Sequence, residues 1–155
     1  MIPTNISILI FCIFVLALLL QSAYVPLRGD GSRACFAKIV IVAICSCLFY
    51  LTSTLCDNHR ELVVVNRILN GFYFSLTAIL PMMWIIYIGK AIKAFRPEHR
   101  VLYNIVCLPM VVLAVLSLIS IGTGWNFEVD EVGVYHRGVL YFPYTIVVAM
   151  YVVVP

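Results

Sequence analysis

The chain has 155 residues, of which 64% are hydrophobic and 11% charged, and its formal net charge is +3. Soluble domains have about 25% charged residues, so this composition excludes an ordinary soluble protein. The small positive charge does not indicate a nucleic-acid partner, because the positions of the basic residues along a membrane chain account for it.

The hydrophobic residues are gathered in five runs that contain no Lys, Arg, Asp or Glu, at residues 1–27, 39–56, 68–89, 101–127 and 139–155. Four of them approach or exceed the roughly 20 residues that cross a bilayer core. We therefore expect an all-α membrane protein in which about five transmembrane helices form a bundle. The predicted helices lie at about 4–25, 34–56, 64–92, 101–121 and 139–155.

The first and last runs each pose a question about processing. No basic residue precedes Ile8–Leu20, and Gln21-Ser22-Ala23 is a poor cleavage site, which favours an uncleaved helix over a signal peptide. The last run of 17 residues would span roughly 26 Å, short of a bilayer core of about 30 Å. We therefore expect residues 1–155 to be one membrane domain of a chain that continues beyond Pro155, with a short, genuine terminus at the far side of the membrane as the alternative.

Basic residues predict the orientation of the bundle in the membrane. Seven of the ten flank the first and third loops, and these are Arg28, Arg33, Lys38, Lys90, Lys93, Arg96 and Arg100. The other three, Arg60, Arg67 and Arg137, fall on the opposite side. Because cytoplasmic loops are enriched in Lys and Arg, the N-terminus is expected outside the cell and the C-terminus in the cytoplasm.

The stretch 122–144 separates the last two helices and is rich in turn-forming and acidic residues. Phe127-Glu128-Val129 and Val134-Tyr135-His136 flank a four-residue turn, so we expect a short extracytoplasmic β-hairpin. Gly133 suits a positive φ, and the Asp130 carboxylate suits a bond to the backbone two residues further on. Gly122-Thr123-Gly124 is expected to end the preceding helix.

Three polar residues expected on the same side of the membrane as the hairpin have more than one interpretation. Arg137 is suited to a surface ion pair with the nearby carboxylates, to pinning the hairpin as a lid, or to direct ligand contact. Asn66 and Asn70 are one helical turn apart and share a face, which suits hydrogen bonds between helices or a ligand pocket near the outer surface.

Signatures of catalysis and cofactor binding are missing from the sequence. It has no Gly-rich phosphate loop, no nucleophile motif and no carboxylate within a predicted span. By the predicted topology, His99 lies across the membrane from His59 and His136, which rules out a shared metal site. The six cysteines lie mostly in apolar runs and are expected to be small buried hydrophobes. We expect no cofactor, no metal and no catalytic residue in this segment.

The hairpin stretch also resembles a known pattern. Its elements, in order, are Phe127, Val129, Asp130, four further residues, Tyr135, His136, Arg137, Gly138, Leu140 and Tyr141. The pattern is similar to the extracytoplasmic loop of the N-terminal multi-helix membrane sensor module of Firmicute GGDEF-type diguanylate cyclases and related sensor kinases. Val139 stands where that module usually has a proline. The resemblance is specific over about fifteen residues and implies a sensory input domain.

The expected function is therefore a sensory input that controls a C-terminal cytoplasmic output domain. By resemblance this output is a diguanylate cyclase, which makes cyclic di-GMP from two GTP and would dimerise the protein, or else a histidine kinase. The expected partners are the lipid bilayer and an extracytoplasmic ligand. A small transporter or channel subunit and a membrane-embedded scaffold remain as alternatives. The residues predicted to sense the signal or form the lid are Asp130, Tyr135, Arg137, Asn66 and Asn70.

Overall fold

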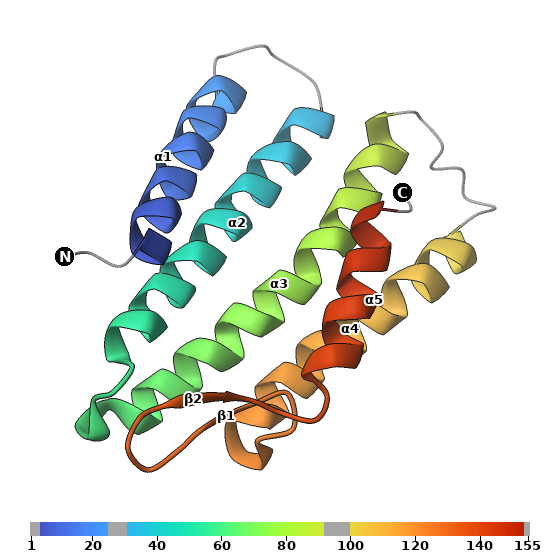
Figure 1. Ribbon diagram of the computed structural model, residues 1–155. Helices are drawn as coiled ribbons and strands as arrows, with labels where there is room; N and C mark the ends of the chain where they lie inside the picture. The colour runs from blue at the N-terminus through green and yellow to red at the C-terminus, as the bar shows by residue number, and fades with distance from the viewer. Residues whose placement is uncertain (1–3, 25–30, 92–99, 154–155) are drawn as a thin grey trace.

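The computed structural model describes residues 4–24, 31–91 and 100–153, with side chains over 6–21, 34–89 and 104–151 (Figure 1). Within these ranges the chain is mostly helical. The elements, in order, are α1 (Thr4–Tyr24), α2 (Gly31–Cys56), the 3₁₀ turn η1 (Arg60–Leu62), α3 (Val63–Ala91), α4 (Arg100–Thr123), β1 (Phe127–Val129), β2 (Tyr135–Arg137) and α5 (Tyr141–Val153).

The first four helices stand side by side in chain order and alternate in direction (Figure 1). Each packs against the next, and α5 packs against α3. The antiparallel hairpin of β1 and β2 lies across one end of the bundle, close to the end of α2, the start of α3 and the end of α4. This end is called the hairpin end below.

Three of the described helical stretches are long and apolar enough to cross a membrane: Ala34–Cys56, Arg60–Gly89 and Asn104–Thr123. Two shorter apolar stretches, Ile6–Gln21 and Tyr141–Tyr151, belong to α1 and α5. The predicted, mostly helical fold with a hairpin between the fourth and fifth helices is therefore confirmed, and three of the described helices are long and apolar enough to span a membrane. That all five helices cross the membrane stays a prediction.

Small and polar residues are buried between the helices together with a few large apolar ones, and many other large apolar side chains are exposed. Ala78 and Ser117 are fully buried, whereas Phe11 and Ile105 are 67% and 60% exposed. Ser46 on α2 hydrogen-bonds Thr77 on α3 at 3.1 Å. Small side chains let helices approach closely where lipid removes the hydrophobic drive to associate. The exposed apolar faces therefore suit contact with lipid.

Three predicted helix boundaries differ from the observed ones by two or three residues: α2 begins at Gly31 rather than 34, and the other two are the end of α4 and the start of α5. The fourth helix is predicted to end at 121 but continues to Thr123. The residue directly after it, Gly124, has a positive φ of 71°, which a helix cannot continue through. The Gly124 N–H caps the helix on the Ser120 carbonyl at 3.0 Å. The fifth helix begins at Tyr141 rather than 139, because the preceding Leu140 N–H is bound to the Trp125 carbonyl.

Several residues that carried sequence-based predictions lie outside the described part of the chain. Arg28, Lys93, Arg96 and His99 lie outside the described ranges, and so do the side chains of Arg33, Lys90 and Arg100. The end of the bundle away from the hairpin is formed by the end of α1, the start of α2, the end of α3 and the start of α4 (Figure 1). Which side of the membrane that end faces stays a prediction.

Candidate functional site

The turn of the hairpin is organised by one carboxylate. Asp130 Oδ1 accepts the backbone N–H of Val132 at 2.9 Å and of Val134 at 2.8 Å, and Gly133 takes a φ of 93°. This confirms the predicted Asp130 and Gly133 roles. The hydrogen bond from Val134, with help from His136 Nε2 at 3.2 Å from Oδ2, holds the pKa of Asp130 below its ordinary value. Asp130 therefore stabilises the turn in its charged form.

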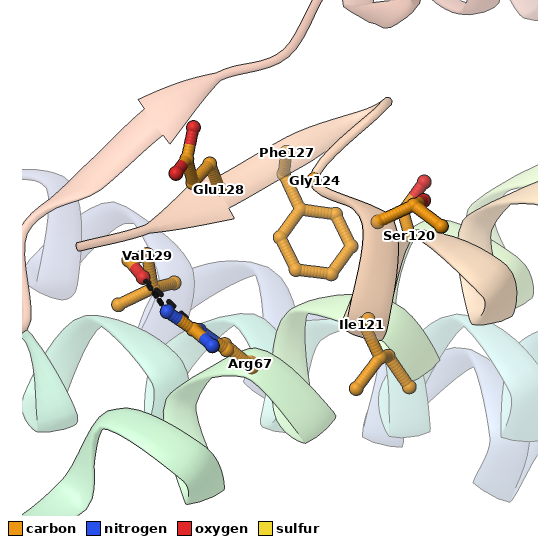
Figure 2. Close-up of a pocket in the computed structure, with 9 residues that line it drawn as sticks. Arg67, Ser120, Ile121, Gly124, Phe127, Glu128 and Val129 are labelled. Carbon is orange, nitrogen blue, oxygen red and sulfur yellow. Dashed lines mark hydrogen bonds between the residues drawn. The ribbon is translucent and has the colours of Figure 1, made fainter. Parts of the chain in front are cut away.

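The hairpin is fastened to the bundle by an arginine that sequence reasoning did not single out. Arg67 reaches from α3 and donates from Nε and Nη2 to the Val129 carbonyl, at 3.0 and 2.6 Å (Figure 2). The Val129 side chain is fully buried. A charged residue beside Asn66, near the start of an apolar helix, could have indicated that Arg67 has a specific partner. The sequence could not identify that partner, because Val129 lies 62 residues further along the chain.

The tip of the hairpin rests on the connection between α2 and α3. The Asn58 N–H donates to the Gly133 carbonyl at 3.1 Å, and Asn58 itself has a φ of 64°. A Cβ on Gly133 would lie 3.0 Å from the His59 backbone. Glycine is therefore needed at 133 both for its φ and for this close contact.

The base of the hairpin is closed against the end of α4. Gly138 N–H donates to the Asn126 carbonyl at 3.0 Å, and Leu140 N–H to the Trp125 carbonyl at 2.8 Å. A Cβ on Gly138 would overlap the Trp125 carbonyl oxygen. These backbone contacts define the neck of the hairpin, residues 124–126 with 138–140, through which the chain enters α5.

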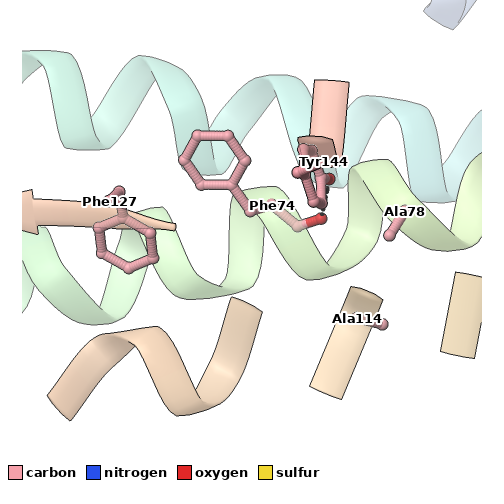
Figure 3. Packing of buried hydrophobic residues seen from close by; sticks show 5 residues of the cluster. All are labelled: Phe74, Ala78, Ala114, Phe127 and Tyr144. Atoms are coloured by element: carbon pink, nitrogen blue, oxygen red, sulfur yellow. Dashed lines mark hydrogen bonds between the residues drawn. The ribbon is translucent and has the colours of Figure 1, made fainter. Parts of the chain in front are cut away.

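Below the hairpin, aromatic rings join β1, α3 and α5. Phe127 is 1% exposed and stacks on Phe74, with ring centroids 5.5 Å apart (Figure 3). The Tyr144 ring meets Phe74 edge-on at 5.4 Å, and its hydroxyl donates to the Phe74 carbonyl at 2.5 Å. The hairpin and α5 therefore share one buried anchor on α3.

Two cavities lie on either side of the hairpin. The first, of about 140 Å³, lies beside β1 and the end of α4, and Arg67 and Glu128 are among its lining residues (Figure 2). The second, of about 300 Å³, lies beside β2, between α2, α3 and the start of α5. Its lining residues are Tyr50, Ser53, Thr54, Asp57, Asn70, Tyr73, Phe74, Tyr135, Arg137 and Tyr141. We call it the tyrosine cavity.

The structure brings three of the five predicted site residues, Asn70, Tyr135 and Arg137, to the tyrosine cavity. Asn66 lies behind them, fully buried, and Asp130 lies in the turn. Asn66 Nδ2 donates to Asp57 Oδ1 at 2.8 Å, and Asn66 Oδ1 accepts from Asn70 Nδ2 at 2.8 Å. The shared face of the two asparagines is thus confirmed. Their bonds join α3 to the residue after α2, within one polar chain.

Arg137 does not pair with a carboxylate in the described part of the chain, where the one ion pair joins His136 and Asp130. Its guanidinium lies over the Tyr141 ring, 4.9 Å from the centroid, a cation–π contact. Burial raises the pKa of Tyr135, so its side chain is a neutral phenol at physiological pH. Sequence reasoning missed Asp57 and the other three tyrosines, because they come from separate helices.

Comparison with known proteins adds no relative to this description. A scan against protein-family models, a search of curated proteins and a search of solved structures each return no match.

Proposed function

We propose that this chain is the membrane-embedded sensory input domain of a bacterial signalling protein. In this proposal the N-terminus and the hairpin face outward, as the distribution of Lys and Arg favours, and α1 and α5 also cross the membrane. A ligand at the hairpin end biases the position of α5, which passes the change to a cytoplasmic output domain.

The observation that carries the proposal is the double attachment of the hairpin. One side is fastened to α3 through Arg67 and the Val129 carbonyl, and the tip is fastened to Asn58. The other side continues through the neck into α5. A ligand bound between the hairpin and the helices would therefore act on α5 through a short, hydrogen-bonded connection.

Two tyrosine hydroxyls hold α5 in its present position. Tyr144 donates to Phe74 on α3, and Tyr151 donates to the Val106 carbonyl on α4 at 2.7 Å. Each bond is worth about 1 kcal/mol. A ligand that binds a second arrangement only tenfold more tightly supplies about 1.4 kcal/mol, so a modest preference is enough to shift the helix.

The output domain is proposed from the resemblance of the hairpin stretch, which implies a diguanylate cyclase, with a histidine kinase next. The test begins with the gene beyond codon 155. A cyclase or kinase coding region in frame supports the proposal, and a stop codon directly after Pro155 overturns it.

The coupling is tested in the full-length protein with Tyr144→Phe, which removes one hydroxyl that joins α5 to α3. Cellular cyclic di-GMP is expected to change severalfold, because a lost bond of about 1 kcal/mol shifts a two-state equilibrium about fivefold. Thr145→Val is the matched control, since its hydroxyl bonds only the Tyr141 carbonyl within α5. Equal cyclic di-GMP in both variants and the parent would contradict the proposed coupling.

A further inference from the structure

The tyrosine cavity carries both signs of charge on opposite elements. Arg137 enters it from β2, and Asp57 enters it from the position directly after α2. These two are not paired with one another, because the one ion pair among the described side chains joins His136 and Asp130. At about 300 Å³ the cavity lies at the small end of ligand pockets, which suits a metabolite.

Each charge is held in place by a neighbour. Asp57 accepts a 2.8 Å hydrogen bond from Asn66, which is fully buried and is itself bonded by Asn70. The Arg137 guanidinium is placed by the Tyr141 ring beneath it. Both charged groups are therefore set before a ligand arrives, which lowers the ordering cost of binding.

The wall between the charges is aromatic and carries hydroxyl groups. Tyr50 and Tyr73 lie with ring centroids 4.9 Å apart, and the Phe74 ring is buried beside them. Tyr135 contributes a half-buried neutral phenol. Such a wall suits an apolar group, and ring faces also attract an ammonium ion.

We propose that the tyrosine cavity binds a small zwitterion that carries an apolar group, with its anionic oxygen atoms on Arg137 and its ammonium on Asp57. A simple anion would be repelled by Asp57 and a simple cation by Arg137, and a neutral ligand would bury one charge or both without compensation. The ligand class is argued from the cavity itself, and only its physiological role rests on the proposed function.

Two sources offer this chemistry. A free apolar amino acid carries a carboxylate and an ammonium, and a phosphatidylethanolamine headgroup carries a phosphate and an ammonium. Both place opposite charges a short distance apart, so the test needs one arm for each source.

In the first arm, the 155-residue chain in nanodiscs of phosphatidylglycerol alone is titrated calorimetrically with L-phenylalanine, 3-phenylpropionate and phenethylamine. The amino acid is expected to bind at least roughly tenfold more tightly than either analogue, since each analogue leaves one charge unpaired. In the second arm, phosphatidylethanolamine replaces part of the lipid. If the headgroup is the occupant, the unfolding temperature rises.

Two variants test the two charged residues one at a time. Arg137→Gln should weaken L-phenylalanine roughly tenfold without weakening phenethylamine, and Asp57→Asn should weaken it similarly without weakening 3-phenylpropionate. In the second arm, the lipid-dependent rise should be lost in both variants. Glu128→Gln is the control, because Glu128 lines the other cavity, and it should bind as the parent does.

Tighter binding of a one-charge analogue, or no response in either arm, would overturn the zwitterion assignment. Because Asp57 also bonds Asn66, each variant is first compared with the parent by its unfolding temperature in phosphatidylglycerol. Arg137 is exposed and bonds no described carboxylate, so Arg137→Gln should fold and by itself decides the case. These measurements need no output domain, so their failure leaves the Tyr144→Phe test of the proposed function standing.

Discussion

At the hairpin end of α3, the Arg67 side chain leaves an apolar helix and donates two hydrogen bonds to a single carbonyl, that of Val129. The donor is charged and half-buried, and Phe127 and Val129 of the strand it holds are buried. Hydrogen bonds to charged groups contribute about 1.5–3 kcal/mol each before solvent screening, so this one residue has a large share in seating the hairpin.

For Arg67→Gln we expect the free energy of unfolding to fall by about 1–3 kcal/mol, because the shorter amide side chain no longer reaches the carbonyl as a charged fork. Denaturant unfolding in detergent micelles measures this. Arg60→Gln is the matched control, since Arg60 is exposed at the same end of the bundle. A loss as large in the control would show that only the charge of this end matters.

A second residue-scale prediction concerns Gly138, where a Cβ would overlap the Trp125 carbonyl. Gly138→Ala should destabilise the protein by about 1–3 kcal/mol, as overpacking does, because the backbone on both sides of the neck must move. Gly122→Ala is the control, since a Cβ there meets open space within α4. The control should be neutral or slightly stabilising, by up to about 1 kcal/mol. Thermal unfolding of both variants decides it.

At the scale of elements, the hairpin depends on a charged Asp130. Because the pKa of Asp130 is lowered in the folded protein, its contribution to stability is complete above the ordinary pKa of about 4. The contribution is lost as the pH falls through the lowered value. The hairpin should therefore loosen below about pH 4.

The unfolding temperature measured between pH 6 and pH 2.5 checks this, with the parent falling more steeply than Asp130→Ala. Glu131→Ala serves as control, since Glu131 is exposed at the same turn and should keep the parent's pH dependence. Parallel curves for the parent and Asp130→Ala would show that the turn does not depend on this carboxylate.

Local chemistry explains why the elements could be predicted from the sequence. Uncharged runs marked the helices, and Asp130 and Gly133 marked the turn, because a side chain that bonds its own neighbours leaves its signature within a few residues. Some predicted helix boundaries were wrong by two or three residues, and one reason is that a distant contact can set a boundary. The start of α5 is such a case, since it depends on the Trp125 carbonyl.

The candidate site was only partly predictable for the same reason. Asn66 and Asn70 could be placed together because they are one turn apart. Assembly of the helices and the hairpin brings Arg67 to the Val129 carbonyl. It also brings Asp57 and Arg137 to the same cavity. No spacing along the chain encodes those meetings.

At the scale of the whole molecule, the proposed orientation places Glu131 outside the cell. The variant Glu131→Cys in intact cells should react with a membrane-impermeant maleimide. The parent's own cysteines, from Cys12 to Cys107, all lie within helices. Labelling of the variant above the parent checks the orientation. Labelling only after the cells are opened would invert the bundle and remove the sensory interpretation.

The closed neck also limits how α5 is able to travel. Gly138 and Leu140 are bound to Asn126 and Trp125, so the first turn of α5 stays beside the last turn of α4. If these two hydrogen bonds persist when the proposed signal arrives, we expect α5 to tilt about the neck rather than slide along its axis. The displacement would then be largest at the end of α5 remote from the neck, where the proposed output domain would receive it.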